Sequence, residues 1–118
     1  MLPSSELLRN DGVGRIITFN KGVRLGALGR SDDAIAVYDD MLARFGSATE
    51  LPLREQVAKG LHNKGVRLGA LGHSKNQVAV LEDLLARFGF AEEPTLAEVV
   101  DLALDSLTQL AFIAMGGE

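Results

Sequence analysis

The chain has 118 residues, is 47% hydrophobic and 24% charged, and can therefore bury the core of one domain. It contains no cysteine, which excludes disulfide scaffolds, thiolate metal sites and cysteine nucleophiles. A formal net charge of −4 argues against a nucleic-acid surface, because such a surface needs a clustered basic footprint. No signal-peptide pattern opens the chain and no apolar run approaches the roughly 20 residues of a spanning helix, so we expect a cytoplasmic protein.

The first segment contains two helix signals separated by a turn signal. The stretch PSSE at residues 3–6 is typical of a helix start, whereas NDG at residues 10–12 is typical of a turn. Either a short helix precedes a second helix from about Val13 to Leu28, or one long helix tolerates two glycines. The turn residues favour the break.

Further residues that signal the end of one helix and the start of the next follow in the chain. Gly29 is a common C-terminal signal and ends the apolar stretch before it. Ser31 is predicted as the N-cap of the next helix, whose apolar stripe ends at Gly46.

Three more helices follow by the same signals. Pro52 suits the first turn of a long helix that ends near Leu71. Ser74 is predicted to cap a helix that ends at Gly89, and Pro94 opens a last helix that extends to Met115. No segment shows strand alternation bounded by hairpin turns, so the predicted fold class is all-α.

The chain also repeats itself. Residues 20–46 and 63–89 are identical at 19 of 27 positions with an offset of 43, and residues 47–62 align more weakly with 90–105. A duplication of this kind predicts one domain over residues 1–118. It consists of an N-terminal flank (1–19), a first unit (20–62), a second unit (63–105) and the end of the C-terminal helix (106–118).

A helix, a glycine-containing turn and a second helix, repeated in this way, resemble the tetratricopeptide repeat. In the first unit, Gly22 and Ala34 stand at the small packing positions of that family, Gly29 at its turn, and Tyr38 and Leu42 at its large apolar positions. The period of 43 and a glutamine in place of the second alanine depart from the family's usual pattern of about 34 residues. They fit a long-period class known from bacterial arrays of nearly identical repeats. The resemblance implies an α-hairpin repeat solenoid. The matching residues of the second unit are Gly65, Leu68, Gly72, Leu81 and Leu85.

The resemblance further implies that the first helix of each unit lines a concave groove for a peptide or helix. A charged carboxylate clamp does not fit, because Phe19 and Val23 stand where such a clamp has Lys and Asn. A mostly apolar groove with a floor of small residues suits an amphipathic helix. The predicted groove residues are Phe19, Asn20, Val23, Gly26, Lys59, His62, Asn63, Val66 and Gly69.

Catalysis finds little support in the sequence. His62 and His73 have no partner at metal-ligand spacing, and neighbouring carboxylates on a helix point about 100° apart, which prevents a catalytic dyad. We therefore expect a non-enzymatic interaction scaffold without a metal or cofactor. The alternative is a small regulatory or ligand-binding α-domain with a polar cluster at Lys59, His62 and Asn63. Helix-turn-helix DNA binding is a third interpretation that the acidic charge disfavours.

The last helix departs from its template in the second unit. Three leucines replace basic residues, and two large apolar residues replace small ones, so most of its circumference is apolar. Such a helix needs cover, and we predict a homodimer, either symmetric or formed by exchange of helices. The predicted self-association residues are Leu107, Leu110, Phe112 and Ile113.

Overall fold

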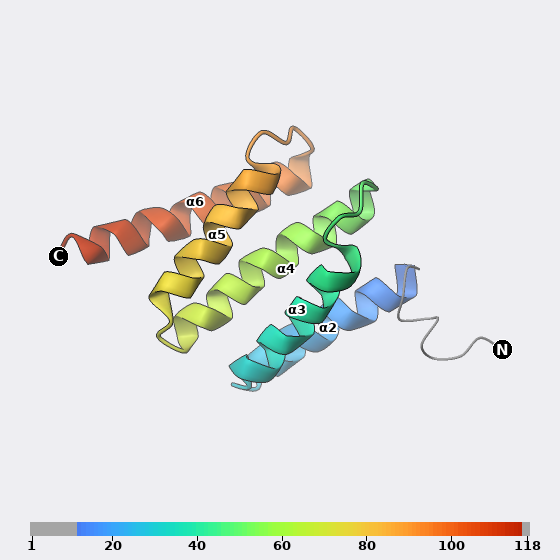
Figure 1. Cartoon of the computed structure of the whole chain (residues 1–118), viewed down its shortest axis with the longest axis horizontal. Coiled ribbons are helices and arrows are strands. Elements are labelled where there is room, and N and C mark those ends of the chain that lie inside the picture. The colour runs from blue at the N-terminus through green and yellow to red at the C-terminus, as the bar shows by residue number, and fades with distance from the viewer. Residues whose placement is uncertain (1–11, 117–118) are drawn as a thin grey trace.

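The computed structural model describes the backbone of residues 12–116 and the side chains of residues 19–116. This part of the chain folds into five α-helices and contains no strand, which confirms the all-α prediction for it (Figure 1). The first predicted helix signal, at residues 3–6, lies outside the described residues. The helices are α2 (Gly12–Ala27), α3 (Ser31–Phe45), α4 (Leu51–Ala70), α5 (Ser74–Phe88) and α6 (Pro94–Ala114).

The helices are arranged around α4, which contacts each of the other four. In the row α2–α4–α6, each helix contacts the next; α3 packs on α2 and α4, and α5 packs on α4 and α6 (Figure 1). α4 spans the boundary between the first unit (20–62) and the second unit (63–105); it forms a hairpin with α5, and α2 and α3 of the first hairpin pack on it. The result is an elongated body of 57 × 33 × 18 Å.

The turns inside the two hairpins have the same geometry. Gly29 and Gly72 adopt left-handed backbone conformations with φ of 77° and 78°, which favour glycine. In the first turn, the backbone N–H of Arg30 donates to the carbonyl of Leu25 at 2.9 Å, and that of Gly29 donates to Gly26 at 3.0 Å. This is the Schellman arrangement, and it satisfies carbonyls that the end of α2 leaves unpaired.

The predicted serine N-caps are wrong. The cap positions belong to Arg30 and His73, and neither makes a side-chain capping hydrogen bond. Ser31 is instead the first residue of α3 and is buried. The Schellman turn explains the difference, because it reverses the chain within two residues and starts the next helix at the serine itself.

The core is continuous through the whole row of helices. Tyr38, Met41 and Phe45 of α3 meet α4, and Leu81 and Leu84 of α5 continue the same cluster toward α6. This packing covers the long helix α4 on both sides. The other buried apolar residues of the core cluster are Ala34, Leu53, Val57, Ala58, Leu61, Phe88, Leu96, Val99, Val100 and Ala103.

Candidate binding groove

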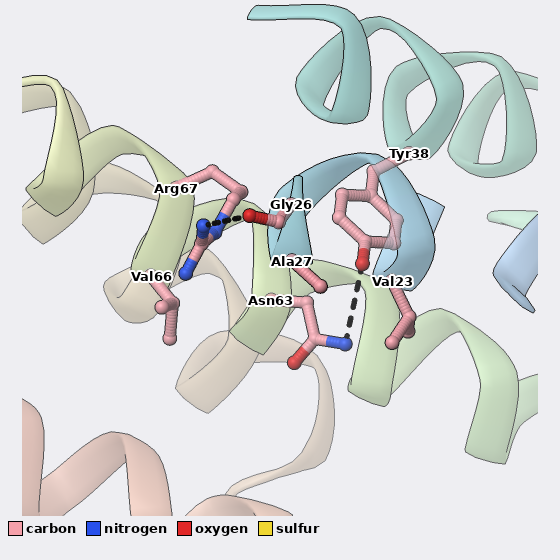
Figure 2. A pocket seen from close by; sticks show the side chains of 7 residues that line it. All are labelled: Val23, Gly26, Ala27, Tyr38, Asn63, Val66 and Arg67. Carbon is pink, nitrogen blue, oxygen red and sulfur yellow. Dashed lines mark hydrogen bonds between the residues drawn. The ribbon is translucent and has the colours of Figure 1, made fainter. Parts of the chain in front are cut away.

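Two hollows lie along the row α2–α4–α6. The first, with a volume of about 270 Å³, lies between α2 and α4 (Figure 2). The second, with a volume of about 490 Å³, lies between α4 and α6. Asn63 of α4 lines both hollows, so they are neighbours along a single helix.

Hydrogen bonds between distant parts of the chain organise the first hollow. The Arg67 guanidinium donates from Nη1 to the carbonyl oxygen of Gly26 at 2.9 Å, and the Asn63 amide donates to the Tyr38 hydroxyl at 3.4 Å (Figure 2). A Cβ atom at Gly26 would lie 3.0 Å from Cδ of Arg67, so glycine permits this close approach. Val23, Ala27 and Val66 complete the lining with apolar groups.

The ionisation of Tyr38, which lines this hollow, is perturbed. Burial raises the pKa of its hydroxyl, while the hydrogen bond from Asn63 and the positive charge of Arg67 lower that pKa by less. The side chain is therefore neutral over the physiological pH range. It presents a hydroxyl, and not a charge, at the base of the hollow.

The second hollow has a mixed character. Phe19, Val99 and Leu102 supply apolar surface. Lys59 and His62 of α4 stand on one wall, and Glu98 of α6 stands on the other. The opposed charges favour a ligand that carries both a positive and a negative charge, or one that presents a polar group to each wall.

Most of the predicted groove residues come together. The exceptions are Asn20, which is exposed outside both hollows, and Gly69. A Cβ atom at Gly69 would lie 2.7 Å from Nε2 of Gln77, so Gly69 faces α5 of its own hairpin. Gln77 stands where the first unit has Ala34, which explains why Gly26 lines a hollow and Gly69 does not. The predicted residues that line the hollows are Phe19, Val23, Gly26, Lys59, His62, Asn63 and Val66.

Some lining residues escaped the sequence analysis. The sequence predicts Tyr38 as a packing residue alone, although its hydroxyl reaches the first hollow. Arg67 also lines that hollow, and the replacement of this arginine in the last helix was a usable signal for its role. Thr95 and Glu98 lie near the start of α6 and carried no signal in the sequence.

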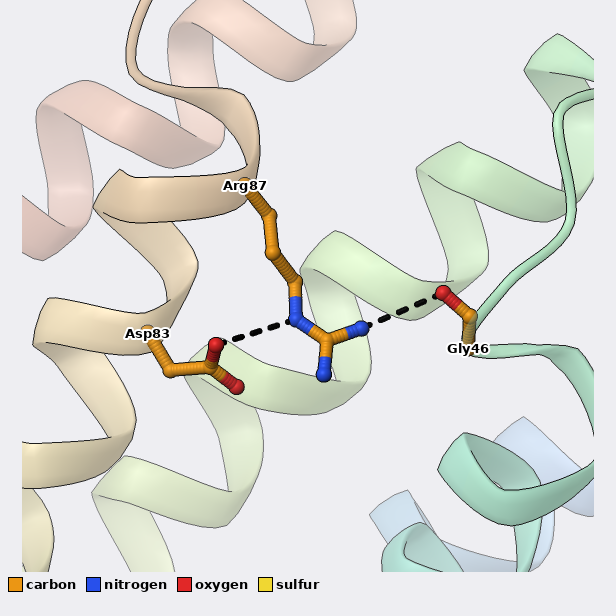
Figure 3. A network of polar contacts seen from close by, with 3 residues as sticks. All are labelled: Gly46, Asp83 and Arg87. Carbon is orange, nitrogen blue, oxygen red and sulfur yellow. Dashed lines mark hydrogen bonds and ion pairs between the residues drawn. The ribbon is translucent and has the colours of Figure 1, made fainter.

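A second arginine also links the two units. Arg87 of α5 donates from Nη1 to the carbonyl oxygen of Gly46 at 3.1 Å, while its Nε contacts Oδ1 of Asp83 at 3.1 Å (Figure 3). Gly46 follows the last residue of α3, where carbonyl groups lack helical partners. Like Arg67, Arg87 reaches a carbonyl 41 residues earlier in the chain. Both arginines therefore link the second unit to the first.

The four predicted self-association residues divide into two pairs. Leu107 and Leu110 are partly buried and pack against the core of their own chain. Phe112 is 55% exposed and Ile113 is 69% exposed. Only the second pair is available to another molecule.

The second histidine of the chain lies outside both hollows. His73 is exposed at the start of α5, away from His62. Among the residues that the structure describes, no three His, Asp or Glu side chains are grouped as metal ligands would be. Within the same part of the chain, every helix is too short or too polar to cross a membrane.

Comparison with known proteins assigns the chain to no family. No protein-family model, no curated protein and no solved structure matches it.

Proposed function

We propose that this protein is a non-enzymatic interaction scaffold, built as an α-hairpin solenoid of two tetratricopeptide-like units. Its ligand is an amphipathic helix or peptide that lies along the row α2–α4–α6. The observation that supports this proposal is the pair of hollows that meet at Asn63. A segment that fills both hollows contacts all three helices of the row.

The chemistry of the lining fits such a ligand. Val23, Val66 and Leu102 remain 44%, 39% and 46% exposed, so their apolar surface is available for contact. An amphipathic helix presents apolar side chains at intervals of three and four residues, which suits hollows separated along one helix. Asn63, which lines both hollows, and Lys59, which lines the second, supply polar contacts that orient the ligand.

The proposal is tested with a peptide selected from a displayed library of helical peptides against the full chain. Val66→Arg places a charge in the first hollow, and we expect it to weaken binding of that peptide by about tenfold or more, or about 1.4 kcal/mol. The matched control is Leu28→Arg. Leu28 is 67% exposed and lines neither hollow, so its variant retains wild-type affinity. Equal affinity of the wild type and Val66→Arg for every selected peptide would contradict the groove.

A second candidate is supported by the polar residues that converge in the second hollow. Lys59, His62 and Glu98 surround apolar surface there, an arrangement that also suits a small ligand with two polar ends. The peptide selection described above, together with a measurement of thermal stability, distinguishes the two functions. A small-ligand domain selects no peptide, and Lys59→Ala removes the stabilisation that a small ligand confers on the wild type.

A further inference from the structure

One face of α6 is uncovered. Its members are Leu104, Thr108, Ala111, Phe112 and Met115, which we call the open face. Each of these residues is exposed, with Leu104 at 45%, Phe112 at 55% and Met115 at 85%. Leu102, which lines the second hollow, lies two residues from Leu104 and hence nearly opposite on the helix. The open face is therefore distinct from the proposed groove.

The internal repeat shows what covers this face elsewhere in the molecule. The equivalent residues of α4, 43 positions earlier, include Leu61, Gly65 and Leu68, and all three are buried. A Cβ atom at Gly65 would lie 3.2 Å from Cδ2 of Leu81 in α5. On α2, the equivalent Gly22 lies against the ring of Tyr38 in α3. In both preceding cases, a helix covers the face.

The side chains of α6 prevent a helix like α3 or α5 from packing in the same way. Thr108 stands at the position of Gly22 and Gly65, and Phe112 stands at the position of Gly69. At Gly22, even a Cβ atom would lie 2.6 Å from Cε1 of Tyr38. The helix that covers α6 must therefore lie farther away and interdigitate with large side chains, as helices do at axial distances of about 8–10 Å.

The charge pattern favours α6 itself as this helix. Residues 106–116 contain no charged side chain, so two copies of this segment meet without like-charge repulsion. In an antiparallel pair centred between residues 109 and 110, the two copies of Asp105 lie about 14 Å apart along the axis, given a rise of about 1.5 Å per residue. That separation exceeds the screening length of about 8 Å at physiological salt.

We propose that the open face of α6 pairs with the open face of a second copy in an antiparallel homodimer. Leu104 then packs against Met115 of the partner subunit, and Phe112 lies beside Thr108 of the partner subunit near the twofold axis. One helix from each copy buries less than the roughly 1,600 Å² of a standard interface, so the dimer dissociates on dilution.

The first experiment measures the mass of the full chain by sedimentation equilibrium from micromolar to millimolar concentration. We expect a monomer–dimer equilibrium in the wild type and at least tenfold weaker association in Phe112→Asp, with an unchanged circular dichroism spectrum. The matched control is Phe90→Asp in the loop between α5 and α6. Phe90 is 101% exposed, so the control changes an equally accessible phenylalanine away from the open face. A monomeric wild type, or a Phe112→Asp dimer as tight as that of the wild type, would overturn the proposal.

The second experiment determines the orientation of the pair and uses the absence of native cysteine. Leu104→Cys and Met115→Cys are prepared separately, mixed and oxidised gently. Antiparallel pairing predicts that the mixture forms far more disulfide-linked dimer than either variant alone, because the two sites face each other. Efficient linkage of Leu104→Cys to itself would indicate parallel pairing and would contradict the proposed dimer.

Discussion

At the scale of single residues, substitutions between the repeats change how each helix is held. Lys64 of α4 forms an ion pair with Asp39, and Arg67 donates to the carbonyl of Gly26. The equivalent residues of α6 are Leu107 and Leu110, which pack against the core. Polar contacts help hold α4 on the first unit, whereas burial of apolar surface holds α6, because a leucine cannot donate to a carbonyl.

The ionisation of Tyr38 provides a prediction at this scale. Burial raises its pKa above the ordinary value of 10.0, so the folded protein keeps a proton that the unfolded chain loses above that pH. The free energy of unfolding therefore decreases as pH rises beyond 10.0. The protein has one tyrosine, so ultraviolet absorbance of tyrosinate reports on Tyr38 alone. We expect the folded protein to ionise at higher pH than the urea-unfolded chain; identical titration curves would contradict the burial of the hydroxyl.

The control for this titration is Tyr38→Phe. This variant removes the tyrosine contribution to the alkaline loss of stability. A difference between the two stability profiles that begins near pH 10 isolates the effect of Tyr38. Profiles that stay parallel through that range would show that the side chain has the same pKa in the folded and unfolded states.

At the scale of elements, the two hairpins pack through equivalent glycines against different side chains. Gly22 of α2 lies under the aromatic ring of Tyr38, which is 2% exposed. A Cβ atom at Gly65 of α4 would lie 3.2 Å from Cδ2 of Leu81, so that side chain needs to move by only a few tenths of an ångström. The glycine at this repeat position therefore tolerates an added side chain less well in the first hairpin than in the second.

This difference predicts opposite outcomes for the same substitution. Alanine is a better helix former than glycine by about 1 kcal/mol, but overpacking a core costs about 1–3 kcal/mol. Gly22→Ala should lower the free energy of unfolding, because its Cβ would lie 2.6 Å from the Tyr38 ring. Gly65→Ala serves as the matched control and should leave stability unchanged or raise it. Urea denaturation measures both, and equal effects would contradict the assigned packing.

At the scale of the whole molecule, α4 joins the two hairpins into one structure. It contacts every other described helix, and Arg67 and Arg87 of the second unit donate to carbonyls of the first. Repeats that stack in this way derive much of their stability from the interfaces between neighbours. One buried cluster runs through both hairpins.

We accordingly expect a single cooperative unfolding transition for the full chain. A truncated chain of residues 1–73 retains α2, α3 and α4 but exposes Leu61 and Leu68, which are buried in the full chain. We expect this truncated chain to be unfolded or aggregated by circular dichroism and light scattering. If it is a well-folded monomer with a sharp melting transition, residues 1–73 are stable by themselves and the shared core is not required.

The sequence by itself determined the helical class and the helix boundaries of residues 12–116 to within about two residues. Pro52, Pro94 and Gly29 act on the backbone within one or two turns, so local chemistry suffices to predict where helices begin and end. Only the tertiary structure decided that Gly69 faces Gln77, that Asn20 lies outside the groove, and that Leu110 packs inward. These outcomes depend on the rotation of each helix about its axis, which is set by side chains distant in the sequence that pack together.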